Sequence, residues 1–160
     1  MYADPIYSDA APHVGAFLRK CPSRHTGDRR VSDEDLRTGS NACITLPDAA
    51  ATLEISPEAV AKWIHLPREQ RPRLIDCREA DELTICQITG NEWFPLGIFP
   101  TAGERLTADA SRGVVVYCHH GMRSLRGASI LRAQGVENAF SMKGGIEAWA
   151  ERIDPEMPRY

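Results

Sequence analysis

From residue 52 onward, short apolar runs alternate with longer segments in which apolar residues recur every three or four positions. This alternation is typical of strands joined by crossover helices, so it predicts an α/β domain. The clearest strand covers residues 114–117, because its three consecutive valines suit a strand that is buried on both faces. Residues 73–76 predict a second buried strand, which ends in an acid.

Weaker patterns predict the remaining elements of this domain. Short strands are expected around residues 53–55, 93–96 and 139–140. Helical spacing is found over residues 57–66, 124–134 and from 144 onward, and a loop or short helix is expected near residue 82. Pro95 places its strand at a sheet edge or in irregular pairing. Trp63, Trp93 and Trp149 fall at apolar positions and are expected in the core.

The first 50 residues have a different texture. They contain few large apolar side chains, several prolines and a polar run from Ser23 to Asn41. Such a segment buries too little apolar surface to offset the entropy of ordering it. The chain is therefore predicted to consist of a poorly ordered arm over residues 1–50, a folded domain over residues 51–153 and a C-terminal tail over residues 154–160.

Composition and charge narrow the classes of protein. A chain of 160 residues that is 42% hydrophobic has room for one compact domain, and it lacks the run of roughly 18 to 20 apolar residues that a membrane span needs. Nineteen Lys and Arg against 22 Asp and Glu give a net charge of −3, which disfavours nucleic acid as a general partner. No basic segment followed by an apolar one opens the sequence, so a cytoplasmic location is expected.

Five cysteines are present, an odd number, and none is in a C-x-x-C pair. This disfavours both a disulfide scaffold and a zinc ribbon. Each cysteine is therefore either a small buried apolar side chain or a reactive thiolate. The five are Cys21, Cys43, Cys77, Cys86 and Cys118.

One cysteine lies between the clearest strand and the helix that follows it. In a parallel α/β sheet, ligands bind beyond the carboxyl ends of strands, where backbone N–H groups and a helix N-terminus stabilise an anion. A thiol at this position has its pKa lowered, which predicts a nucleophile. Gly121 allows the loop to curl tightly. The candidate site residues are Cys118, His119, His120, Gly121, Met122, Arg123 and Ser124.

Three motifs together resemble the single-domain rhodaneses, or rhodanese-homology domains. They are the D-x-R-E box at Asp76–Glu79, the segment VVVYCHHGMRS, and G-G-x-x-x-W ending at Trp149. The resemblance extends from about Leu53 to Trp149. It implies a three-layer α/β fold with a central five-stranded parallel sheet and helices on both faces. It also implies that Cys118 carries sulfur as a persulfide, with no metal or organic cofactor.

The implied activity is that of a sulfurtransferase. Cys118 takes sulfur from a small donor, thiosulfate or a persulfide, and passes it to a thiol or a cyanide-like acceptor, or to an acceptor protein. Cysteine-dependent phosphatases use a C-x5-R loop, whereas Cys118 to Arg123 is C-x4-R, so phosphatase activity is disfavoured. The rival hypothesis from another class is a non-catalytic interaction module that binds a partner protein. An intact cysteine favours the enzyme.

The residues around the nucleophile have alternative roles. Arg123 either presents charge to the donor or braces the loop against an acid such as Asp76 or Glu79. Asp76 and Arg78, at the end of the neighbouring strand, are expected to form a bidentate pair with loop or helix groups, a structural role that shapes the site. His119 and His120 stand where thiosulfate-preferring rhodaneses carry basic residues, so the resemblance does not fix thiosulfate as the donor. These adjacent histidines are not expected to bind a metal ion.

Each of two further cysteines also has two possible roles. Cys77, inside the D-x-R-E box, and Cys86 are either resolving thiols for Cys118 or packed side chains. Packing is favoured, because the position inside the box is commonly apolar and faces inward in the family that the sequence resembles.

Overall fold

The computed structural model of the protein describes residues 44, 46–108 and 110–160. Most of the predicted arm, with Cys21 and Cys43, lies outside the described residues. At its end, Ile44 and Leu46 pack against the core, and the Ala49 carbonyl accepts a hydrogen bond from Arg132 at 2.8 Å. The domain boundaries at residues 50 and 153 stay predictions.

The centre of the domain is a five-stranded sheet in which all pairings are parallel, as expected. The strand order is β1-β5-β4-β2-β3, which places β4 in the middle and β3 at one edge. The strands are β1 (Glu54–Ile55), β2 (Arg73–Asp76), β3 (Glu92–Trp93), β4 (Val114–Tyr117) and β5 (Ala139–Met142). Both strands predicted as buried, β2 and β4, are buried at every position.

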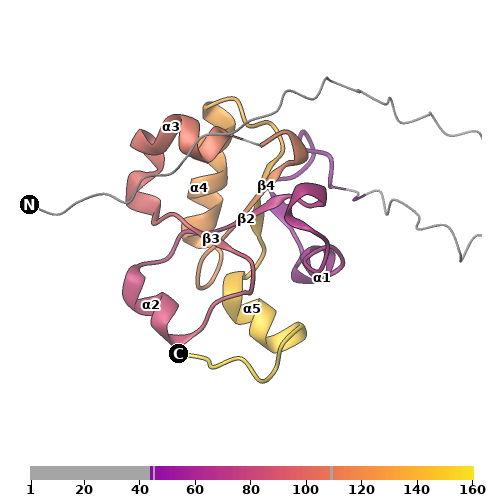
Figure 1. The fold of residues 1–160 in the computed structure, drawn as a ribbon, viewed down its shortest axis with the longest axis vertical. Helices are drawn as coiled ribbons and strands as arrows, with labels where there is room; N and C mark the ends of the chain where they lie inside the picture. Colours follow the sequence, from indigo (N-terminus) through magenta and orange to yellow (C-terminus); the bar gives the residue numbers. More distant parts are fainter. Residues whose placement is uncertain (1–43, 45, 109) are drawn as a thin grey trace, which may run out of the picture. The chain divides into compact units, whose positions relative to one another are not determined.

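Helices alternate with the strands along the chain (Figure 1). The α-helices are α1 (Pro57–Ala61), α2 (Ala80–Ile85), α3 (Phe99–Thr107), α4 (Met122–Ala133) and α5 (Gly145–Arg152). Short 3-10 helices are η1 (Arg68–Gln70), η2 (Leu96–Ile98) and η3 (Ala110–Arg112). Ser56 starts α1 by accepting a hydrogen bond from the Ala59 amide, as its position before a proline predicts.

Alternate residues of the strands divide the core into two layers, one on each face of the sheet. On one face, Leu74, Val115 and Phe140 pack in a cluster with residues of α1 and α5. On the other face, Val114 and Val116 pack with residues of α3 and α4. The predicted three-layer arrangement is therefore confirmed.

Several local predictions differ from the structure. The helix expected over residues 57–66 ends at Ala61. The stretch Leu96 to Arg112 is short for the crossover helix expected before the fourth strand, yet α3 forms there because Phe99 and Leu106 insert fully into the second core layer. Trp93 is 47% exposed, so its assignment to the core is wrong: it lies on the edge strand β3, where one side of the backbone has no neighbour.

The register of β2 and β4 brings the motifs together. Asp76 pairs with Tyr117, and the pairing continues one step further, since the Cys77 amide donates to the Tyr117 carbonyl at 2.9 Å. The carboxyl ends of the two strands therefore lie side by side. The D-x-R-E box and the Cys118 loop consequently share one edge of the sheet.

Candidate active site

Cys118 directly follows β4, and its side chain is nearly enclosed, with 1% of the residue exposed. The backbone amide of Gly121 donates to its sulfur at 3.1 Å and the amide of Ser124 does so at 3.4 Å. Gly121 has φ of +100°, a left-handed conformation that favours glycine and that turns the loop back toward the sulfur. The loop thus forms a small bowl of N–H donors around one sulfur atom.

A pair of buried serines supports this bowl. The Ser124 hydroxyl lies 3.5 Å from the Cys118 sulfur and donates to the Gly121 carbonyl at 2.9 Å. It also lies 2.8 Å from the hydroxyl of Ser141 on β5. Sequence reasoning did not find Ser141, because its strand is four positions long and carries no motif. The two serines tie the N-terminus of α4 to the sheet.

The two glycines of the G-G-x-x-x-W motif lie beneath the loop. At the start of α5, the Ile146 amide donates to the Cys118 carbonyl at 2.8 Å and the Glu147 amide to the His119 carbonyl at 3.1 Å. A Cβ on Gly145 would collide with both of these carbonyls. The glycine therefore lets α5 approach closely enough for its first amides to bind the loop carbonyls.

These contacts change the acidity of the nucleophile. The pKa of Cys118 is lowered to about 5, first by the neighbouring Cys77 thiol and then by the Ser124 side chain and the Ser124 and Gly121 amides. Burial acts in the opposite direction, because it disfavours the charged form. The lowering dominates, which favours the thiolate form of Cys118.

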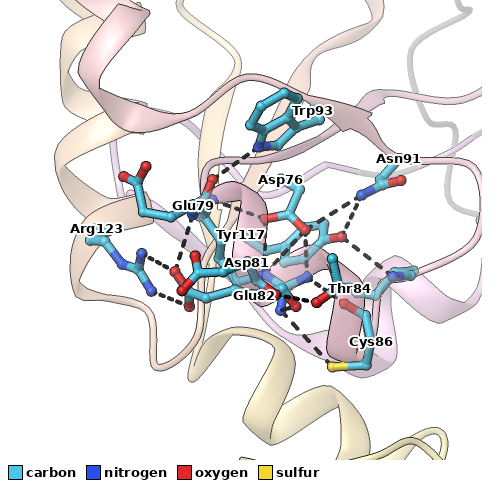
Figure 2. A network of polar contacts seen from close by, with 12 residues as sticks. Asp76, Glu79, Asp81, Glu82, Thr84, Cys86, Asn91, Trp93, Tyr117 and Arg123 are labelled. Carbon is cyan, nitrogen blue, oxygen red and sulfur yellow. Dashed lines mark hydrogen bonds and ion pairs between the residues drawn. The ribbon is translucent and has the colours of Figure 1, made fainter.

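Arg123, the last residue of the C-x4-R segment, turns away from the sulfur toward α2. Its guanidinium donates to both carboxylate oxygens of Glu82, at 2.5 and 2.6 Å (Figure 2). This pairing lowers the pKa of Glu82 to about 2. The brace that the sequence suggested therefore exists, but its acid is Glu82 rather than Asp76 or Glu79. Glu79 instead forms a capping box with Glu82 at the start of α2.

Asp76 and Arg78 form a fully buried ion pair, with 0% of either side chain exposed. The guanidinium donates to Asp76 at 2.6 to 3.1 Å, to the Cys86 carbonyl at 2.7 Å and to the Glu82 carbonyl at 3.3 Å. The Asn91 side-chain amide donates to the Tyr117 hydroxyl at 2.8 Å and to the Asp76 carboxylate at 3.5 Å (Figure 2). The pair fixes the loop between β2 and α2 and does not contact the sulfur.

The C-terminal tail lies against the active-site loop. The Tyr160 ring stacks on His119 with 4.1 Å between ring centroids, and His119 stacks in turn on His120 at 3.8 Å. The Tyr160 hydroxyl accepts from Arg78 at 2.9 Å and donates to Glu82 at 2.8 Å. Sequence reasoning missed this residue, since nothing in the tail signals a contact with a loop 40 residues earlier.

The side chains of the loop itself divide into covered and exposed ones. Burial and the neighbouring His120 lower the pKa of His119, so it adds no full positive charge at neutral pH. His120 is exposed, and Met122 is 76% exposed. Among the loop side chains, Arg123 is the one with a permanent charge, and Glu82 neutralises it.

The two other described cysteines lie in different surroundings. Cys77 is completely buried next to Cys118, whereas Cys86 is half-buried near Arg78, with 3.9 Å between its sulfur and the guanidinium. Of these two described cysteines, Cys77 is thus the one beside Cys118.

A cleft of about 270 Å³ borders the loop, and another cavity lies elsewhere. The cleft is lined by Glu79, Leu96, Gly97, Pro100, Arg123, Arg126 and Ile130. The other cavity, of about 350 Å³, lies between α1, α5 and the segment around Ile88, away from the sulfur. Within the described residues, no three His, Cys, Asp or Glu side chains are grouped to hold a metal ion. No helix in the same part of the chain is long and apolar enough to cross a membrane.

Known proteins resemble this chain over the folded domain. A curated relative from Arabidopsis thaliana, rhodanese-like/PpiC domain-containing protein 12, is 34% identical over 90 residues, which are 55% of this chain and 30% of that protein. The thiosulfate sulfurtransferase GlpE of Pseudoalteromonas translucida is 27% identical over 63% of this chain and 94% of its own length. The human single-domain sulfurtransferase TSTD1 has the same fold, with a TM-score of 0.55 at 20% identity, over 63% of this chain and 97% of its own.

The family model for the rhodanese-like domain matches residues 56–152. This span runs from the cap of α1 to the last residue of α5, and so includes the whole Cys118 loop and both motifs that support it. The chain therefore belongs to the rhodanese-like domain family.

Proposed function

We propose that the protein is a sulfurtransferase that carries sulfur as a persulfide on Cys118. The observation that carries this proposal is the bowl: the Gly121 and Ser124 amides donate to the sulfur of Cys118, a residue that is 1% exposed, and its lowered pKa favours the thiolate. Such preorganised donors stabilise an anionic sulfur without reorganising during the reaction. Membership of a family that contains sulfurtransferases supports the same function.

The reaction needs two displacements at sulfur. In the first, the Cys118 thiolate attacks the outer sulfur of the donor; the S–S bond of the donor breaks and sulfite leaves thiosulfate, or a thiolate leaves a persulfide. In the second, an acceptor such as cyanide or a thiolate attacks the outer sulfur of Cys118–S–S⁻, and the Cys118 thiolate leaves. Electrons are conserved at each step, so neither a metal nor an organic cofactor takes part.

The charge around the bowl favours a persulfide donor over thiosulfate. Thiosulfate is a dianion, and the permanent cation of the loop, Arg123, is already paired with Glu82. The same pairing argues against a phosphatase, which needs its arginine turned toward the phosphate. The narrow access to Cys118 favours a donor with a slender sulfur end. An acceptor protein and a cytoplasmic location stay predictions.

The proposal is tested with Cys118→Ser, in which the hydroxyl stays protonated at neutral pH. This variant is expected to fold normally, to lose transfer of sulfur from thiosulfate or glutathione persulfide to cyanide, and to lose the reducible gain of one sulfur in its intact mass. Cys86→Ser, which removes the half-buried thiol near Arg78, is the matched control and is expected to keep both.

Two outcomes would contradict the proposal. One is sulfur transfer by Cys118→Ser at the rate of the unmodified protein. The other is an unmodified protein that never gains sulfur from either donor, which would favour the non-catalytic interaction module.

A further inference from the structure

A cavity of about 300 Å³ lies at the opposite end of the sheet from the Cys118 loop. Arg73 begins β2 and Arg112 lies two residues before β4, whereas Cys118 follows the last residue of β4. The residues of β4 span about 13 Å, so this cavity is separate from the bowl. Its lining includes four arginines and one acid: Arg68, Arg73, Arg105, Arg112 and Glu92.

The lining carries an excess of positive charge. Guanidinium groups stay protonated at physiological pH, and Glu92 is the one carboxylate among the described residues that line the cavity. Four positive charges and one negative charge give a net charge of +3 at this place. The whole chain has a net charge of −3, so the excess is local.

Glu92 is already engaged by two of the four arginines. Its carboxylate accepts from Nε and Nη2 of Arg73, each at 3.1 Å, and pairs with Arg68 at 2.8 Å. The Nη1 group of Arg73 donates to three carbonyls at the C-terminal end of α3, at 2.7 to 3.2 Å. Arg73, whose side chain is 8% exposed, is therefore fixed and forms a rigid inner wall of the cavity.

The other two arginines have no carboxylate partner. Within the described residues, neither Arg105 nor Arg112 forms an ion pair, and both are exposed. The Arg105 guanidinium lies over the Phe94 ring, 5.5 Å from its centroid, and Arg112 donates through Nε to the Arg71 carbonyl at 3.4 Å. The Nη groups of these two arginines are thus available to a ligand.

A fifth arginine adjoins the group through this contact with Arg112. Arg71 is buried, and its Nη2 donates to the Gly90 carbonyl at 3.0 Å, but its Nε and Nη1 have no hydrogen-bond partner in the described part of the chain. Burial lowers the pKa of Arg71, and the positive charge of Arg68 lowers it further. Like charges therefore repel each other here, and a bound anion relieves that repulsion.

We propose that this cavity binds a small anion with two or more negative charges, of the phosphate or carboxylate class. Arg105 and Arg112 hold it by charge-assisted hydrogen bonds, because the planar guanidinium fork matches the oxygen atoms of both groups. Arg73 and Arg68 add positive charge without moving, since Glu92 fixes them. The volume suits a small molecule rather than a protein surface. This site does not depend on sulfur transfer.

The test is binding of two probes, inorganic pyrophosphate and citrate, to the full chain by isothermal titration calorimetry at constant ionic strength. At least one probe is expected to bind with a Kd below about 1 mM, and the tighter one identifies the preferred group. Arg105→Gln and Arg112→Gln are each expected to weaken binding by about tenfold, the scale of one hydrogen bond to a charged group. The double variant is expected to lose about 100-fold.

A matched control separates this site from general attraction of anions. Arg152→Gln removes the same charge from α5, where Arg152 pairs with Glu58, and is expected to keep the Kd of the unmodified protein. Thermal melting without ligand establishes that each variant is folded. Pyrophosphate is expected to raise the melting temperature of the unmodified protein and of Arg152→Gln, but not that of the double variant.

The proposal is overturned if neither probe binds, or if sodium chloride at the same ionic strength raises the melting temperature as far as pyrophosphate does. It is also overturned if the double variant binds pyrophosphate as tightly as the unmodified protein, because the anion then binds elsewhere, such as at the amides of the Cys118 loop. None of these measurements requires sulfur transfer, so their failure is separate from failure of the proposed function.

Discussion

Two arginine–carboxylate pairs involve the segment from the end of β2 to α2, and they differ in their surroundings. The inner pair, Asp76–Arg78, is completely buried, and each guanidinium nitrogen of Arg78 has a partner. The rim pair, Glu82–Arg123, has side chains that are 15% and 35% exposed. The Tyr160 hydroxyl joins the two pairs by bonding both Arg78 and Glu82.

The comparison shows that an arginine–carboxylate pair has a different effect when it is buried and when it is partly exposed. A buried pair contributes little net stability, because desolvation offsets its attraction, yet losing one partner is costly. The inner pair is therefore an anchor that holds the β2–α2 loop in one conformation. A partly exposed pair is weaker and screened by solvent, so the rim pair chiefly sets the local charge near Cys118.

The largest expected effect comes from breaking the inner pair. Arg78→Met leaves the Asp76 carboxylate buried without its cation, and the free energy of unfolding is expected to fall by about 3 to 5 kcal/mol. Urea denaturation measures this loss. Arg68→Met is the matched control: Arg68 also pairs with a glutamate, but its side chain is 67% exposed, so a change of about 0.5 kcal/mol is expected. Equal losses in the two variants would contradict the contrast between buried and exposed pairs.

A smaller effect is expected from neutralising the rim acid. Glu82→Gln releases Arg123 from its partner and leaves a positive charge beside the bowl. The KM for thiosulfate is expected to fall by a factor of about 3 to 10, corresponding to the roughly 1 kcal/mol of an exposed ion pair, and the gain should shrink as salt is added.

The control for this change is Glu58→Gln, which alters net charge equally but lies on α1, where Glu58 pairs with Arg152. It is expected to leave the KM unchanged. An unchanged KM in Glu82→Gln as well would show that Arg123 does not govern recruitment of the donor.

The smallest effect is expected at the residue that joins the two pairs. Tyr160→Phe removes the hydroxyl and keeps the ring that stacks on His119. The free energy of unfolding is expected to fall by about 1 kcal/mol, the scale of an ordinary hydrogen bond. Turnover should change by less than about twofold, because the bowl amides are untouched. Thermal melting together with the cyanide assay measures both; a loss as large as that of Arg78→Met would mean that the tail belongs to the inner anchor.

Local sequence signals predicted the parts of the site that depend on neighbours along the chain. Three consecutive valines followed by a Cys and a Gly predicted β4 and the loop after it, because strand propensity and a left-handed turn depend on the local sequence. The N-terminus of α4 was also expected directly after this loop, because its signals are local as well. The helix α3 has no clear local signal, because its formation depends on two apolar side chains packing into a core that the segment itself does not reveal.

Contacts between distant segments were predicted less well. The partner of Arg123 was expected inside the D-x-R-E box, whereas in the structure it is Glu82, in the first turn of α2. The sequence offered several acids within reach, and only the orientation of α2 chooses among them. The contact of Tyr160 with the loop had no local signal at all.

The sequence by itself determined the α/β class and the buried strands and pointed to Cys118 as the candidate nucleophile, because each depends on short-range pattern or on a motif. Only the tertiary structure decided what surrounds that nucleophile. The parallel register of β2 and β4 places the Cys77 thiol beside Cys118, and the glycine at the start of α5 allows the loop carbonyls to be bound. The strand register and the close approach of α5 to the loop each involve two segments that are distant in the sequence. The free energy that selects them is gained only when the two segments pack together.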